Sequence, residues 1–251
     1  MRRVLALLLC LPAAAIAQGL FADKEVAKHI DQLGDGVVLR EIDAPVIQDP
    51  TNWVGRQEGI YRYRYVAGDD HGKVEQLERH TPDPARPKLA WTRHVGESLI
   101  EGIDVVDGQG IRLHTETDLE HGYRVEIKPG ITLPPGTQVG DSWRSDNTLT
   151  VYQLPDTGEV AHRGSLDASR RYLGAYRVRV PAGEFDAVLI EETYNLKVGP
   201  LSADDRRYVF YARDVGMVAE VEGLRASALI VFRMTQDSAK VLTAYPSPAA
   251  P

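Results

Sequence analysis

The chain has little cysteine: among its 251 residues there is one, Cys10. It lies in an N-terminal stretch with the features of a secretory signal peptide, since Arg2 and Arg3 precede a short apolar run and residues 15–17 (AIA) form a small-x-small cleavage site. We therefore predict that residues 1–17 are a signal peptide cleaved after Ala17. The mature chain would contain no cysteine, which excludes disulfides, thiolate nucleophiles and cysteine-ligated zinc.

The sequence also lacks a long hydrophobic run. The apolar part of the leader is shorter than the ~20 residues that a helix needs to span a bilayer, so we predict a protein that is not membrane-spanning. Leu9 precedes Cys10 where a bacterial lipobox requires a small residue, which argues against a lipid anchor. The predicted location is the periplasm.

Basic charge is in deficit. The chain has 29 Lys and Arg against 36 Asp and Glu, for a formal net charge of −7 at pH 7. An acidic surface of mixed charge argues against nucleic acid as a partner and provides no attraction to anionic lipid.

Motifs for catalysis and for cofactors are missing as well. There is no G-x-S-x-G or S-x-x-K motif for a serine nucleophile and no glycine-rich loop for phosphate. Glu191 and Glu192 are adjacent on an expected strand, so their side chains should point to opposite faces and cannot act as a catalytic pair. We predict no catalytic residues and no cofactor.

Metal-ligand spacing is also lacking. None of the seven histidines forms H-x-H or HExxH. His114 and His121 flank an expected turn, with Glu116, Asp118 and Glu120 between them, and this is the one arrangement that could gather metal ligands. Surface histidines and carboxylates are usually only solvated. We predict no metal site.

What the sequence does contain is a succession of β-strands. The helical spacing of Val26, Ile30 and Leu33 predicts one short N-terminal helix within Phe21–Leu33. From Trp53 onward, alternating segments are separated by turns. We predict an all-β fold with one strongly curved antiparallel sheet, a meander forming a half-barrel or open barrel. It would be a single domain over residues 18–245, followed by a disordered tail over 246–251.

The stretch 176–222 has the most pronounced strand pattern. Val178 and Val180 alternate with arginines, and residues 181–183 (PAG) break the ladder, so Gly183 is expected at a positive φ. The strand that follows is apolar on both faces in its first half and polar on both in its second. We expect Phe185 to be the first side chain that this strand places in the core.

Three motifs carry a family resemblance: V-G-D-S-W at residues 139–143, V-P-A-G-E-F-D-A at 180–187 and Y-A-R-D-V-G-M-V at 211–218. Together they resemble a set of uncharacterised bacterial exported β-sheet proteins of the "PAGxF … YAxxVGxV" type. The resemblance covers mainly residues 130–225 and implies a curved sheet similar to the half-barrels of periplasmic lipoprotein carriers. Arg213-Asp214 stands where a Pro-Gly turn is common, and the resemblance implies no catalytic residues.

Three functional hypotheses remain open. The first is a non-catalytic periplasmic protein that binds an apolar ligand, a lipid or a lipoprotein segment on a curved sheet. The second is a cell-envelope assembly or accessory protein that binds a protein partner. The third is a hydrolase with carboxylate chemistry. For the first, the candidate ligand-binding lining consists of aromatic side chains: Tyr61, Tyr63, Tyr65, Trp91, Tyr208 and Phe210.

Overall fold

The computed structural model describes residues 20–69, 71, 75–156, 158–228 and 232–246. The predicted signal peptide and nearly all of the predicted tail, from residue 247, lie outside them. After helix α2 (Lys24–Ile30) and the short helix η2 (Asp31–Leu33), the described elements are β1 (Val38–Ile42), η3 (Pro50–Asn52), β2 (Gly59–Gly68), β3 (Glu75–Pro82), β4 (Ala90–Val95), β5 (Leu99–Val106), β6 (Gly110–Asp118), β7 (Tyr123–Leu133), β8 (Ser142–Gln153), β9 (Val160–Val180), β10 (Gly183–Val198), β11 (Leu201–Ala212), β12 (Gly216–Ala228) and β13 (Phe232–Ala244).

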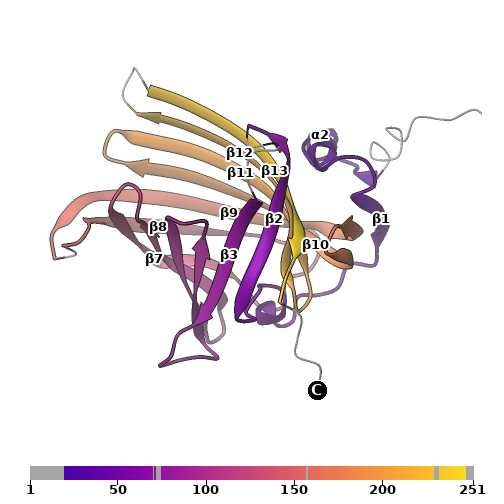
Figure 1. The fold of residues 1–251 in the computed structure, drawn as a ribbon, viewed down its shortest axis with the longest axis horizontal. Helices are drawn as coiled ribbons and strands as arrows, with labels where there is room; N and C mark the ends of the chain where they lie inside the picture. The colour runs from indigo at the N-terminus through magenta and orange to yellow at the C-terminus, as the bar shows by residue number, and fades with distance from the viewer. Residues whose placement is uncertain (1–19, 70, 72–74, 157, 229–231, 247–251) are drawn as a thin grey trace, which may run out of the picture.

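The strands form one antiparallel sheet that closes on itself (Figure 1). Strands β2 to β13 each pair with the next along the chain, and β13 pairs back with β2, which gives a barrel of 12 strands. The prediction of an all-β meander with one short helix is confirmed. The prediction of a half-barrel or open barrel is wrong, because the pairing between β13 and β2 leaves no free edge in the barrel.

Strand β9 extends beyond the barrel proper. One edge pairs with β10 from residue 164 to 180, while the other pairs with β8 from residue 160 to 171 and with β1 from 175 to 178. A register shift at Leu189/Ile190 in the β9–β10 ladder lies between these two parts. Strand β1 lies before Trp53, outside the region in which the sequence predicted strands.

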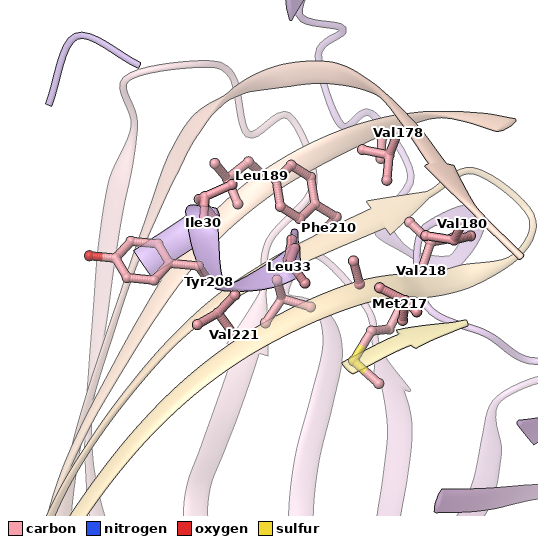
Figure 2. Close-up of a cluster of buried hydrophobic side chains, with 14 of the residues drawn as sticks. Ile30, Leu33, Val178, Val180, Leu189, Tyr208, Phe210, Met217, Val218 and Val221 are labelled. Carbon is pink, nitrogen blue, oxygen red and sulfur yellow. The ribbon is translucent and has the colours of Figure 1, made fainter. Parts of the chain in front are cut away.

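Helix α2 covers the outer face of the long strands. Asp23 caps it by accepting a hydrogen bond from the Glu25 amide at 2.9 Å. Its apolar side, with Ile30, continues into Leu33 of η2 and packs over Phe210 and Leu189 (Figure 2). The helix therefore buries a sheet surface that would otherwise be an exposed apolar patch. In the described part of the chain, no helix has the length and apolar character needed to cross a membrane.

A segment before β2 closes one end of the barrel. The Ile47 amide donates to the Thr137 carbonyl at 2.7 Å, and the Tyr172 hydroxyl donates to the Pro45 carbonyl at 3.0 Å. The Asn52 carbonyl accepts from the Asp214 amide at 2.6 Å. Thr137 and Asp214 belong to the β7–β8 and β11–β12 turns, which lie at the same end of an up-and-down barrel. We call residues 45–55 the plug.

The β9–β10 turn has the predicted backbone geometry. Gly183 has φ of +143°, and a Cβ placed there would meet only the Phe185 ring, at 3.5 Å. Phe185, expected as the first side chain of this strand in the core, packs against the edge of the core cluster and edge-on against Tyr245, and it is half-buried rather than buried. Phe185 is close to the barrel end, where fewer elements surround it than surround Phe210.

We expect Gly183→Val to lower the free energy of unfolding by about 1–3 kcal/mol, because a β-branched residue tolerates this backbone conformation poorly. Thermal or urea denaturation measures the effect. The control is Glu184→Ala, whose ion pair with Arg179 is exposed, so that its loss should change stability by less than about 1 kcal/mol. Equal stability of the two variants would show that this turn is not strained.

Candidate functional site

The interior of the barrel contains a partly open cavity of about 480 Å³. It begins at Val54 of the plug and reaches Leu196 and Leu224, which lie near the opposite end of β10 and β12. One wall, formed by β5, β6 and β7, is largely apolar. Its side chains are Ile103, Ile111, Leu113, Ile127, Ile131 and Leu133.

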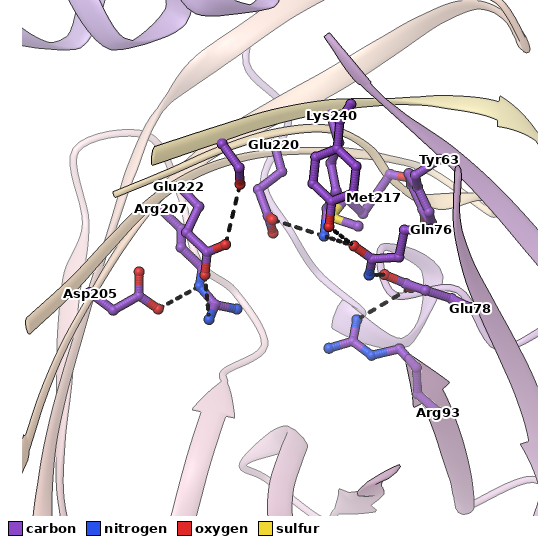
Figure 3. Close-up of polar contacts among 12 residues, drawn as sticks. Tyr63, Gln76, Glu78, Arg93, Asp205, Arg207, Met217, Glu220, Glu222 and Lys240 are labelled. Carbon is purple, nitrogen blue, oxygen red and sulfur yellow. Dashed lines mark hydrogen bonds and ion pairs between the residues drawn. The ribbon is translucent and has the colours of Figure 1, made fainter. Parts of the chain in front are cut away.

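The opposite wall is charged, and its side chains point toward one another from β3, β4, β11, β12 and β13 (Figure 3). In all, the lining includes seven carboxylates and four cationic side chains. The carboxylates are Glu78, Glu101, Glu116, Glu192, Asp205, Glu220 and Glu222, and the cations are Arg93, Arg170, Arg207 and Lys240. The cavity therefore has a mostly apolar side, to which β5 and β6 also contribute Glu101 and Glu116, and an ionic side.

Arg170 of β9 and Glu192 of β10 form the best-connected ion pair of the cavity lining. Its guanidinium donates to Glu192 Oε1 at 3.0 Å, to the Thr132 carbonyl at 2.9 Å and to the Tyr194 hydroxyl at 2.9 Å. Burial opposes ionisation of Glu192, but the adjacent Arg170 and the Tyr194 hydrogen bond together lower the pKa of this carboxyl. Glu192 is thus a buried, ionised carboxylate, and both of its oxygens already accept hydrogen bonds from the protein, from Arg170 and from Tyr194.

A second group is centred on Arg207 of β11. Its Nε donates to Asp205 Oδ2 at 2.7 Å, and Nη2 lies 2.8 Å from Glu222 Oε1. Asp205 Oδ1 is buried and has no hydrogen-bond partner among the described residues. Burial raises the pKa of Asp205 to about 6, although Arg207 acts in the opposite direction. Asp205, which lines the cavity, therefore retains a buried acceptor that no described donor uses.

A third group of polar side chains links β13 with β12 and β3. Lys240 Nζ lies 3.0 Å from Glu220 Oε1 and donates to Gln76 Oε1 at 3.2 Å, and the Gln76 amide donates to Glu78 at 3.2 Å. Burial opposes ionisation of Glu78, but Arg93 and other neighbouring cations hold its pKa at about 2. In this group too, each charged side chain is paired with an opposite charge of the protein: Lys240 with Glu220, and Glu78 with Arg93.

Glu116 differs from the other carboxylates of the lining. It has no hydrogen-bond or ion-pair partner within the part of the chain that the structure describes. Burial, followed by the nearby charge of Glu101, raises the pKa of Glu116 to about 7. Glu101 is directly opposite Glu116 in the β5–β6 register and is paired with Arg93.

The structure separates the candidate aromatic residues into two groups. Alternation along β2 places Tyr61, Tyr63 and Tyr65 on the inner face, where Tyr65 lines the cavity and the other two are buried. Trp91 is buried beside Ile103 and Val54, near the plug. Tyr208 and Phe210 lie on the outer face beneath α2, on the side of β11 opposite Arg207.

The predicted orientation of Glu191 and Glu192 is confirmed. Glu192 is buried beside Arg170 in the barrel, whereas Glu191 contacts Arg171 at 2.9 Å on the other face, where the arginine is partly exposed. The two histidines considered for a metal site have separate surroundings. His121 pairs with Asp118 at 2.8 Å in an exposed turn, and His114 is half-buried on β6. Within the described residues, no group of three or more His, Cys, Asp and Glu side chains could hold a metal ion.

The charged interior was not anticipated from the sequence. The period-2 spacing of Asp205 and Arg207 on one strand, and of Glu220 and Glu222 on the next, indicates a polar face on two neighbouring strands. A polar face of a sheet usually meets solvent, so this signal alone does not place the residues inside a barrel. The cross-strand alignment of Arg207 with Glu222 was the available indication that the charges pair with one another.

No known protein family and no curated protein matches the chain. Three solved structures resemble it weakly. A candidate exported protein with a YmcC-like fold from Bacteroides fragilis has 16% identity and a TM-score of 0.41 over 76% of this chain and 97% of that one. A candidate lipoprotein from Parabacteroides distasonis has 10% identity and a TM-score of 0.32 over 76% and 96%.

The third is the hypothetical lipoprotein YmcC from Escherichia coli, with 8% identity and a TM-score of 0.36 over 77% of this chain and 92% of that one. At these TM-scores the likeness supports no functional assignment.

Proposed function

We propose that this chain is a non-catalytic binding protein of the bacterial cell envelope that takes a small amphipathic ligand into the barrel. The observation that supports this is the two-sided cavity. Its volume of about 480 Å³ is within the range of about 300–1,000 Å³ typical of small-molecule sites. The apolar wall of β5–β7 suits the body of such a ligand, and the ionic wall suits a polar group.

The envelope location follows from the expected signal peptide with cleavage after Ala17. Of the candidate aromatic residues, Tyr65 is the one that lines the cavity, and it donates a hydrogen bond to Gln76 at 2.6 Å. The burial of Tyr208 and Phe210 beneath α2 favours a ligand inside the barrel over one on the outer face of the sheet. This arrangement also favours a small molecule over a lipoprotein segment, because the plug closes one barrel end.

The test is binding of the neutral fluorescent probe N-phenyl-1-naphthylamine, whose emission rises in apolar surroundings. Ala203 lines the cavity, so Ala203→Trp should fill it and reduce probe affinity at least about tenfold. The matched control is Asp204→Trp, which places the same ring on the exposed outer face of the same strand and should leave affinity unchanged. Equal affinity of both variants and the parent would place the probe outside the barrel and contradict the proposal.

A further inference from the structure

We infer that the cavity selects amphipathic ligands that carry a positive charge, such as an amine on an apolar chain, and that Asp205 and Glu116 receive this charge. The inference rests on the proposed binding function and adds to it the chemical class of the ligand. It follows from an imbalance in the lining, where some carboxylates have unused acceptors while the cations are already paired.

Asp205 provides the first observation. The residue is 7% exposed, and Arg207 occupies Oδ2 only, which leaves Oδ1 buried without a donor among the described residues. A buried acceptor without a partner is costly, commonly by as much as a hydrogen bond contributes. A ligand N–H group that reached Oδ1 would satisfy it, and the positive charge of an ammonium would strengthen that bond.

Glu116 provides the second observation, from the other side of the cavity. It faces Glu101 directly across the β5–β6 ladder, and like charges in this relation repel one another. Arg93 ion-pairs with both Glu101 and Glu78, so its charge is already shared between two carboxylates. A cation held beside Glu116 would compensate its charge without breaking a described ion pair.

The pairing of the four cations in the lining also favours a positively charged ligand. Arg170 pairs with Glu192, Arg207 with Asp205 and Glu222, Lys240 with Glu220, and Arg93 with Glu78 and Glu101. An anionic ligand would have to displace an internal carboxylate from one of them. A cationic ligand meets carboxylates that still have acceptors, next to the apolar wall that would hold its chain.

The test compares ligands that share a chain and differ in charge, as competitors of N-phenyl-1-naphthylamine at pH 8. Decylamine should bind at least about tenfold more tightly than decanol, because a hydrogen bond to a charged group is stronger than one between neutral groups. Decanoate should bind more weakly than decanol, and spermidine, which has charge but no apolar chain, more weakly than decylamine. Equal affinities for decylamine and decanol would overturn the inference.

These outcomes distinguish a failure of the charge selectivity from a failure of the proposed binding function. If the neutral probe and decanol bind in the cavity while charge makes no difference, the proposed function stands and the charge selectivity is wrong. If neither the probe nor any of the chain compounds binds, the proposed function fails and the inference fails with it. If spermidine bound as tightly as decylamine, the apolar wall would contribute nothing to binding, and this result would also overturn the inference.

Substitutions test the two residues directly. Glu116→Gln and Asp205→Asn should each weaken decylamine about tenfold and leave decanol and the probe within about twofold of the parent. Unchanged probe affinity shows that the cavity has formed in each variant. The control is Glu120→Gln, which removes the same charge from the exposed β6–β7 turn and should not alter decylamine affinity. Weakening by Glu120→Gln equal to that by Glu116→Gln would indicate a general charge effect and contradict the assignment.

The pH dependence supplies an independent readout. With pKa values of about 7 for Glu116 and about 6 for Asp205, both carboxyls lose their protons between pH 5 and pH 8, while decylamine stays charged. Decylamine affinity should therefore rise over this range and decanol affinity should stay flat. The charged groups acting on Glu116 are Glu101, Arg207, Asp118 and Arg93, and those acting on Asp205 are Arg207, Glu222 and Glu220.

In Glu116→Gln, the part of the rise near pH 7 should disappear while the part near pH 6 remains. Decylamine affinity that is constant from pH 5 to pH 8 in the parent protein would contradict the assignment of the charge to these carboxyls.

Discussion

Replacing Arg170 with methionine is expected to lower the free energy of unfolding by about 3–5 kcal/mol, the usual cost of removing one partner of a buried ion pair. The Arg170 side chain is 13% exposed and that of Glu192 is 7% exposed, so the carboxylate would remain in the barrel without its counterion. The carbonyl of Thr132 and the hydroxyl of Tyr194 would each lose a donor in the same substitution. Urea denaturation monitored by circular dichroism measures the change.

The adjacent residue provides a matched control. Arg171 pairs with Glu191 on the outer face, and its side chain is 45% exposed, so Arg171→Met should cost less than about 1 kcal/mol. The double variant Arg170→Met with Glu192→Gln should recover part of the loss, because no unpaired charge is then buried. If Arg170→Met and Arg171→Met were equally stable, the described packing of Arg170 inside the barrel would be incorrect.

A second large effect is expected on the outer face. Phe210 has no solvent exposure and lies between the long strands and α2, so Phe210→Ala should destabilise the protein by about 3–5 kcal/mol. The loss combines the transfer free energy of the ring with the cavity left beneath Ile30 and Leu33. Thermal denaturation followed by circular dichroism provides the measurement.

Phe185→Ala is the comparison for this substitution. It removes the same side chain from a half-buried position at the barrel end, so it should cost clearly less than Phe210→Ala. A similar loss in both variants would mean that the β9–β10 turn is packed as tightly as the surface under α2. Because both variants lie outside the cavity, neither should change the affinity for N-phenyl-1-naphthylamine in the fraction that is folded.

The sequence was sufficient to predict the short helix and the meander from Trp53 onward, but not strand β1. Alternation separated Tyr61, Tyr63 and Tyr65 from the arginines between them, and the same rule placed Glu191 and Glu192 on opposite faces. The short helix followed from the spacing of Val26, Ile30 and Leu33. These features depend on residues close in sequence, for which local periodicity is a direct physical signal.

What the sequence did not reveal depends on which face of the sheet is enclosed. Period-2 spacing shows that Arg207 and Tyr208 face opposite ways, but it does not show which of them points into the barrel. The usual preference for burying aromatic residues suggested Tyr208 and Phe210 for a concave binding surface. In the structure α2 buries these two on the outside, and the charged residues face inward because they compensate one another across neighbouring strands.

The pairing of β13 with β2 affects how the barrel assembles. Every other ladder of the barrel joins strands consecutive in the chain, so each can form as a local hairpin with little loss of chain entropy. The β13–β2 ladder joins the first and last strands of the barrel and contains two register shifts, between Ala239 and Lys240 and between Leu242 and Ala244. We therefore expect this ladder to form last. Until it forms, the chain is an open sheet with two unpaired edge strands, which can pair with another copy, and it has no enclosed chamber for a ligand.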